Sequence, residues 1–223
     1  MPSIKHLLNE QLALIAQSLT SPQRLEILEY LSQAERSVDE LSQLVSLSVA
    51  NTSHHLQVLK QAALVTVRHV GEKRFYKLTG NDITNLISSF RNTAEIHLTE
   101  VERLMQSYLN KKDTLEAIDA QELLERSKCN EVTILDIRPK EEFNSGHLPN
   151  AINILPDEIN ERINNLKKNK EIIAYCRGPY CLYAYDAIKA LRDQGFRAKR
   201  LEYGFPEWKA AGHPVQQNLI QGE

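Results

Sequence analysis

The pattern of apolar residues changes near the middle of this 223-residue chain, and this change constrains the fold more than any other feature. Before about residue 110, apolar side chains recur mostly at helical spacing. After the polar segment 110–113, short apolar runs of strand length alternate with amphipathic helical segments. Such alternation is typical of an α/β domain with a mostly parallel sheet. The sequence therefore predicts a mainly α-helical domain over residues 1–110, a linker, and an α/β domain over residues 115–217.

The composition favours a soluble, cytoplasmic protein with no membrane contact. The chain holds three cysteines, no charged-then-apolar signal segment and no long uncharged apolar run, so we expect no structural disulfide framework. The net charge of −2 conceals an asymmetry. Residues 1–44 carry three Lys or Arg against six Asp or Glu, whereas residues 45–79 carry five against one. This local basic patch fits contact with a polyanion.

The first domain is predicted to be a winged helix-turn-helix. A capping-box pattern at residues 37–40 starts a short third helix, and Ser48 can cap a fourth helix that runs from Val49 to Gln61. Two strand-like runs, residues 64–70 and 73–78, then form a basic hairpin. A short helix, a turn, a second helix and a basic hairpin in this order indicate the winged fold.

The fourth helix turns Leu56 and Leu59 inward and offers small or hydrogen-bonding side chains on its other face. Such side chains suit the reading of base edges in double-stranded DNA, although an ordinary polar helix face is the alternative. The basic hairpin favours the DNA-binding interpretation, because Lys and Arg contact phosphates. The residues expected at DNA are Ala50, Asn51, Ser53, His54 and Gln57 of the helix and Arg68, Lys73 and Arg74 of the hairpin.

The run SVANTSHHLQVLKQAALV at residues 48–65, with the hairpin that follows, resembles the recognition helix and wing of ArsR-type (ArsR/SmtB) bacterial transcriptional regulators. The resemblance covers about the first hundred residues and implies a homodimer built from the first and last helices, here residues 5–19 and 82–109. Many such regulators sense metals. In this chain the third helix lacks cysteine, and His97 and Glu100 supply only two ligands, so we expect no metal site.

In the second domain, residues 172–182 place a thiol where a strand gives way to a helix. The apolar run that starts at Ile172 stops at Cys176, a tight turn follows, and Cys181 opens a segment with helical spacing. The unpaired N–H groups and the dipole at a helix N-terminus favour a negative sulfur, which lowers the pKa of a thiol, and they attract anions. Cys176 is therefore the first candidate for chemistry.

Residues 136–153, a cysteine at a strand end and the GFPEW segment at 204–208 resemble, in order and spacing, the rhodanese (sulfurtransferase) domain. The resemblance covers residues 115–217. It implies that Cys176 accepts a sulfane sulfur from a small donor, becomes a persulfide, and passes the sulfur to a thiol or other acceptor without a cofactor. Backbone N–H groups of residues 177–181, including those of Gly178 and Tyr180, would cradle the terminal sulfur.

Loop length separates this domain from phosphatase relatives, which need an arginine at the sixth position after the cysteine. That position is Leu182 here, so phosphate-ester chemistry is not expected. Many single-domain rhodaneses carry a basic residue where Cys181 stands, and Pro179 removes one N–H donor. Arg177 remains as the cation of the loop and could assist an anionic substrate.

Cys181 has two interpretations. As a second thiol it could resolve a persulfide on Cys176, releasing sulfide and leaving a disulfide. Alternatively it is a small buried helix residue. For Cys129, which lies in a polar turn, no chemical role is expected. The supporting residues expected to form an ion-pair network behind the loop are Asp136, Arg138 and Glu142.

Three functions follow from these patterns. The leading hypothesis is a transcriptional regulator in which the rhodanese domain reads reactive sulfur or thiol oxidation through Cys176. The second is a sulfurtransferase enzyme whose winged helix localises or dimerises it. A third is a site for a soft ion such as trivalent arsenic, for which a third ligand is not evident.

Overall fold

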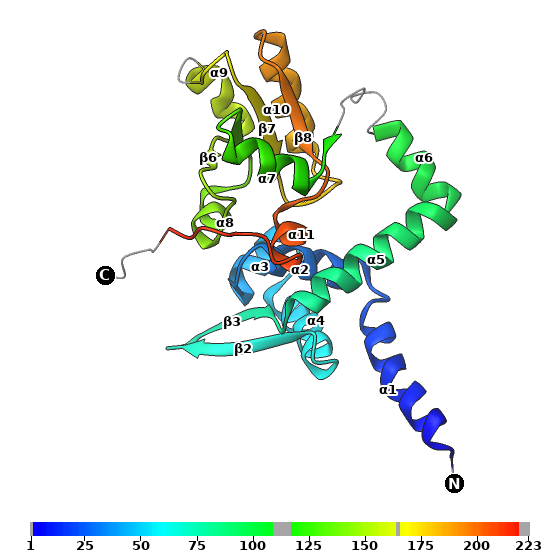
Figure 1. Cartoon of the computed structure of the whole chain (residues 1–223). Coiled ribbons are helices and arrows are strands. Elements are labelled where there is room, and N and C mark those ends of the chain that lie inside the picture. Colours follow the sequence, from blue (N-terminus) through cyan, green and yellow to red (C-terminus); the bar gives the residue numbers. More distant parts are fainter. Residues whose placement is uncertain (1, 109–116, 164–165, 219–223) are drawn as a thin grey trace. The chain divides into compact units, whose positions relative to one another are not determined.

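The computed structural model describes residues 2–108, 117–163 and 166–218, and it divides the chain into two compact units, Met1–Ile87 and Ser88–Glu223 (Figure 1). The expected linker at residues 110–113 lies outside the described residues. None of the helices in the described ranges has the length and apolar character needed to cross a bilayer.

Local capping explains where the helices of the first unit begin. The Ser21 hydroxyl accepts a hydrogen bond from the Arg24 N–H, and Pro22 occupies the first helical position. At residue 37 the predicted capping box is present, with the Glu40 carboxylate 2.6 Å from the Ser37 nitrogen. The capping box confirms the sequence prediction for the start of the third helix. The helices are α1 (Ile4–Ser18), α2 (Pro22–Gln33), α3 (Val38–Leu44), α4 (Val49–Gln61) and α5 (Asn81–His97), of which α5 continues past Ile87 into the second unit.

The wing is an antiparallel hairpin of β2 (Val65–Val70) and β3 (Lys73–Leu78), as predicted. A short strand that the sequence did not indicate, β1 (Arg36–Ser37), pairs with the other edge of β3. The core beneath contains Leu56 and Leu59 of α4, which are fully buried. Inward packing of these two leucines turns the opposite face of α4 toward solvent.

The segment predicted as one helix over residues 82–109 is two helices, α5 and α6 (Thr99–Tyr108). The Leu98 carbonyl accepts hydrogen bonds from the N–H groups of Val101 and Glu102, as the residue before a helix does. Acidic Glu100 and Glu102 then fall in the first turn of α6, where the helix dipole favours negative charge. The prediction of a single helix was therefore wrong at Leu98.

A parallel sheet organises the second unit, with strand order β4-β8-β7-β5-β6. Side chains of β7 alternate between two hydrophobic clusters: Ile172 and Ala174 face one, and Ile173 and Tyr175 face the other. Both faces are buried because helices cover both. The strands are β4 (Ala117–Ile118), β5 (Val132–Asp136), β6 (Ile152–Asn153), β7 (Glu171–Tyr175) and β8 (Ala198–Leu201).

One face of this sheet is covered by α9 and α10, and the other by α7 and α11 (Figure 1). Between β6 and β7 the described residues form a 3-10 turn followed by α9. The helical elements are α7 (Ala120–Lys128), α8 (Lys140–Ser145), η1 (Pro156–Glu158), α9 (Ile159–Arg162), α10 (Leu182–Asp193) and α11 (Phe205–Ala210). This is the α/β domain that the sequence predicted.

We expect Ser37→Ala to lower the free energy of unfolding by about 1 kcal/mol, because it removes the oxygen that caps α3. Urea unfolding followed by circular dichroism measures the change. Ser89→Ala, at an exposed position within α5, is the matched control and should change the free energy by less than about 0.5 kcal/mol. Equal effects of the two substitutions would contradict a stabilising role for the capping box.

Candidate functional site

Cys176 lies directly after β7, at the carboxyl edge of the parallel sheet, and is 3% exposed. Ligands of open α/β sheets bind at this edge, outside the carboxyl ends of the strands. A disulfide joins Cys176 to Cys181, and their Cα atoms are 6.2 Å apart, within the range that disulfides bridge. The structure thus closes residues 176–181, which we call the cysteine loop, into a small covalent ring.

The helix after the loop begins one residue later than expected. Cys181 is the N-cap of α10, which starts at Leu182. Within the loop, the Cys181 N–H donates to the Gly178 carbonyl oxygen at 3.1 Å. This donor, expected to cradle a terminal sulfur, is therefore occupied in the disulfide-linked loop.

Gly204 lies against the cysteine loop. A Cβ atom on Gly204 would lie 2.4 Å from the Arg177 carbonyl carbon and from the Gly178 nitrogen, so only glycine fits there without moving the loop. Next to it, the Phe205 N–H donates to the Cys176 carbonyl oxygen at 3.0 Å. The sequence singled out residues 204–208 as a motif, but it did not reveal this contact.

A buried ion pair joins Asp136, the last residue of β5, to Arg138. Both side chains are fully buried, and Arg138 Nη2 lies 2.6 Å from Asp136 Oδ2. Arg138 also donates to the Gly146 carbonyl oxygen at 2.7 Å. The Tyr175 hydroxyl donates to the same carboxylate, and burial with the nearby Asp136 charge raises the pKa of Tyr175 well above its usual value. Tyr175 therefore stays protonated and links the ends of β5 and β7.

Glu142 of α8 is fully buried and binds Arg177, which follows Cys176 in the cysteine loop. Arg177 Nη2 lies 2.7 Å from Glu142 Oε1, and Arg177 Nε lies 3.0 Å from the same oxygen. The expected supporting network thus extends into the loop itself. In this state the charge of Arg177 is balanced by Glu142, so help for an anionic substrate would require this ion pair to open.

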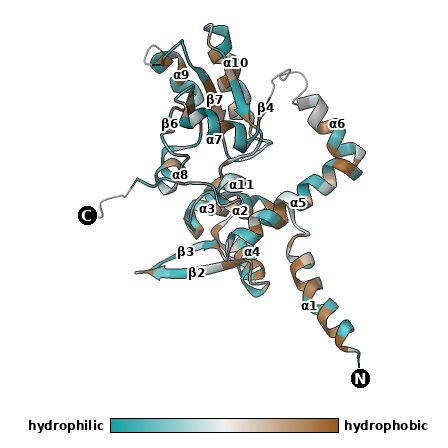
Figure 2. Cartoon of the chain, viewed as in Figure 1, coloured by the Kyte–Doolittle hydropathy of each residue, from teal (hydrophilic) through white to brown (hydrophobic). Residues whose placement is uncertain are grey.

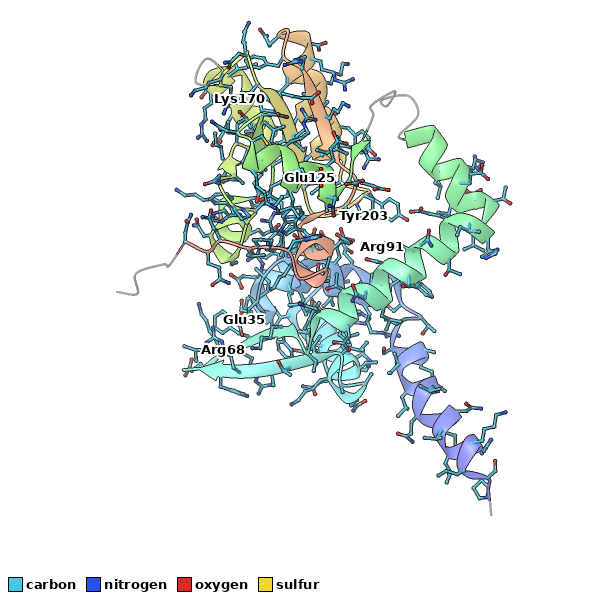
Figure 3. All side chains as sticks on the ribbon, in the orientation of Figure 1. Glu35, Arg68, Arg91, Glu125, Lys170 and Tyr203 are labelled. Carbon is cyan, nitrogen blue, oxygen red and sulfur yellow. A yellow bond between two sulfur atoms is a disulfide. The ribbon has the colours of Figure 1, made fainter. Side chains whose placement is uncertain are left out.

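The winged helix presents the other expected site. Asn51, His54, Gln57 and Ala50 of α4 are exposed and Ser53 is partly exposed, while Lys73 and Arg74 are exposed near the tip of the hairpin. Arg68 differs, because Glu35 binds its guanidinium at 2.6 Å (Figure 3). A phosphate contact by Arg68 would therefore compete with this carboxylate.

Two family models match the chain, one to each unit. Residues 21–67 match the bacterial regulatory protein arsR family, and residues 119–211 match the rhodanese-like domain. The winged helix and the cysteine-bearing parallel sheet are therefore the folds that these families share.

Known proteins resemble the whole chain or one unit of it. The HTH-type transcriptional regulator Rv0324 of Mycobacterium tuberculosis is 38% identical over 218 residues, covering 98% of this chain and 96% of the relative. The putative sulfurtransferase YtwF of Bacillus subtilis is 31% identical over 84 residues, covering 38% of this chain and 80% of that protein. A third match is the solution structure of the homodimeric winged helix-turn-helix DNA-binding domain of Mb0332 from Mycobacterium bovis. Its sequence is 31% identical, the match covers 44% of this chain and 91% of the Mb0332 chain, and the TM-score is 0.41.

The likeness over nearly the full length of both chains decides the family. This chain belongs to the ArsR-type HTH transcriptional regulators and carries a rhodanese-like domain after its winged helix. The sequence-based resemblance to both families is confirmed.

We expect Asp136→Asn to destabilise the rhodanese-like domain by about 3–5 kcal/mol, because Arg138 would remain buried without its counter-charge. The single tryptophan, Trp208, is buried in this domain, so its fluorescence during urea unfolding reports the change. Asp193→Asn, at an exposed position at the end of α10, should change the unfolding free energy by less than about 0.5 kcal/mol. A similarly small effect of Asp136→Asn would contradict the importance of the buried pair.

Proposed function

We propose that this regulator senses sulfane sulfur or thiol oxidation at Cys176 and changes its affinity for double-stranded DNA in response. The observation that carries the proposal is the Cys176–Cys181 pair, bonded across the loop at the carboxyl edge of the sheet. Two thiols that can join and separate give the domain two covalent states. A regulator needs two states that differ in their free energy of binding to DNA.

The chemistry proposed for the pair conserves sulfur and electrons. The Cys176 thiolate attacks the sulfane sulfur of a small persulfide donor, the donor thiolate leaves, and Cys176 carries the persulfide. The Cys181 thiolate then attacks the inner sulfur on Cys176 and displaces the outer sulfur as hydrosulfide. The two cysteines are oxidised to the disulfide while the transferred sulfur is reduced to sulfide. A small thiol can later reduce the disulfide and reset the pair.

For the DNA-binding unit we propose a homodimer with one recognition helix, α4, in each half-site. The apolar face of α1 supports this, since Figure 2 shows hydrophobic residues along a helix that is largely exposed in the single chain. Burial of these side chains against a second copy would remove apolar surface from water. The exposed large residues of α1 are Ile4, Leu7, Leu8, Leu12 and Leu14.

A second candidate function is a sulfurtransferase enzyme in which the winged helix localises or dimerises the catalytic domain. The resemblance to YtwF, which is named a putative sulfurtransferase, favours it. The enzyme and the sensor differ in how often one protein molecule transfers sulfur. Rapid repeated transfer from thiosulfate or a thiol persulfide, with no effect of the donor on DNA binding, would favour the enzyme.

We expect Lys73→Ala and Arg74→Ala to weaken binding to all duplexes and to lower the salt slope by about 1 each, because these side chains would neutralise phosphates. Asn51→Ala and His54→Ala should instead change sequence preference, by about 1–3 kcal/mol at the base pair each one reads. Fluorescence anisotropy on operator and scrambled duplexes at several salt concentrations separates the two classes. Lys128→Ala on α7 is the charge control and should leave binding unchanged. Equal effects of both classes on every duplex would contradict these roles.

We also expect a persulfide donor to change the DNA affinity of the wild-type protein and to have no effect on Cys176→Ser, because serine cannot accept sulfane sulfur. Titration of DNA with and without donor measures both affinities. Cys129→Ser removes the exposed free thiol and is the matched control, which should respond like the wild type. A Cys176→Ser protein that responds to the donor as strongly as the wild type would exclude Cys176 as the sensor.

A further inference from the structure

The second half of α5 lies on the cysteine loop within the unit Ser88–Glu223. Ser88, Arg91 and Glu95 are spaced by three and four residues, so they share one face of the helix. These three positions are partly buried, whereas Phe90, Asn92 and Thr93 are exposed. This face, which we call the α5 reader face, therefore has a partner in the rhodanese-like domain.

Tyr180, near the end of the loop, makes two contacts with the reader face. Its hydroxyl donates a hydrogen bond to the Glu95 carboxylate. The Arg91 guanidinium carbon lies 5.7 Å from the centre of its ring, a cation–π distance. A hydrogen bond weakens steeply as its angle departs from linear, so the Glu95 contact depends on where Tyr180 is held.

Arg91 also lies close to the loop backbone and to the segment beneath it. Arg91 Nη1 is 3.8 Å from the position that a Cβ of Gly178 would take, and 3.7 Å from Glu207 Oε1. Glu207 in turn accepts hydrogen bonds from the Ser88 hydroxyl and, at 3.2 Å, from the Gly204 N–H. The loop therefore contacts Arg91 and Glu95 directly, and Gly204 is linked to Ser88 and Arg91 through Glu207.

We propose that the Ser88–Arg91–Glu95 face of α5 reads the covalent state of the cysteine loop, by holding Tyr180 when Cys176 and Cys181 are bonded and releasing it when they are not. This inference rests on the proposed function, because it assigns the element that responds to the sensor. The same continuous helix places Ile83 and Ile87 in the core of the first unit. A change in the contacts of residues 88–95 therefore acts on the same helix that packs into the core of the first unit.

The ring closed by the disulfide explains why the two states differ at Tyr180. Tyr180 directly precedes Cys181, and the bond to Cys176 fixes that end of the loop 6.2 Å from its start. When the bond is reduced, two electrons and two protons from a thiol reductant convert it to two thiols, and residues 177–180 gain conformational freedom. The contact with Glu95 is then weakened by the entropy of the open loop.

The redox equilibrium of the pair tests this directly, without DNA or a sulfur donor. The full-length protein is equilibrated in mixtures of reduced and oxidised dithiothreitol, its thiols are alkylated, and mass spectrometry gives the fraction reduced. Because the hydrogen bond to Glu95 would stabilise the disulfide form, Tyr180→Phe and Glu95→Ala should each favour reduction by about tenfold. Such a change raises the midpoint potential by about 30 mV.

Two controls keep the result specific. Tyr183→Phe, three residues further along and exposed, and Glu100→Ala, which contacts Arg103 on α6, should leave the equilibrium unchanged. The double variant Tyr180→Phe/Glu95→Ala should shift it no more than either single variant, because the two residues form one contact. No shift in the single variants, or fully additive shifts in the double variant, would overturn the reader face.

A DNA-binding measurement on the same variants separates this inference from the proposed function. If the donor changes the DNA affinity of the wild type but not that of Glu95→Ala, with Cys176 modified equally in both, the reader face is supported. An equal donor response in the wild type and Glu95→Ala would overturn it while leaving the proposed function intact. A wild type that ignores the donor would refute the proposed function, and the redox shift alone would then decide on the reader face.

Discussion

The buried ion pair of Asp136 and Arg138 is the interaction on which the carboxyl edge of the parallel sheet depends. Neither charge has access to water, so each needs the other and the hydrogen bonds around the pair. Tyr175 and the Gly146 carbonyl supply those bonds, and the Leu148 N–H in turn donates to the Tyr175 hydroxyl. The pair thus joins β5, β7 and the turn after α8, and it fixes the strand end from which Cys176 emerges.

The cysteine loop is held from several directions once that strand end is fixed. Glu142 binds Arg177, and Gly204 and Phe205 support the backbone beneath it. The disulfide closes the loop on itself, and Tyr180 extends from it to Glu95. A loop restrained in this way has few alternative conformations, so a change in one covalent bond can alter a small number of specific contacts rather than being absorbed by general mobility.

Local chemistry explains how much of this could be predicted from sequence. Caps such as Ser37 with Glu40, the basic hairpin and the apolar run before Cys176 depend on neighbouring residues, and all three appear where the sequence placed them. The features that were missed depend on residues far apart in the chain. β1 pairs with β3 across about forty residues, and Gly204 meets a loop that precedes it by 26 residues.

Contacts to α5 were also beyond the reach of sequence reasoning. Arg91 and Glu95 are four residues apart on a helix, a spacing that suggests an ion pair within the helix and gives no sign of Tyr180. Similarly, the charges of Glu142 and Arg177 were recognised, but the partner of each is set by how α8 and β7 pack. A buried side chain finds its partner through the tertiary fold, which local patterns do not contain.

The central claim, that the covalent state of Cys176 sets the affinity for DNA, is tested most directly by measuring both quantities on one sample. Graded amounts of a persulfide donor are added, mass spectrometry gives the fraction of Cys176 modified or bonded to Cys181, and anisotropy gives the DNA affinity of each sample. The account predicts that the change in binding free energy follows the modified fraction from none to complete. A protein whose Cys176 is completely modified while its DNA affinity stays constant would contradict it.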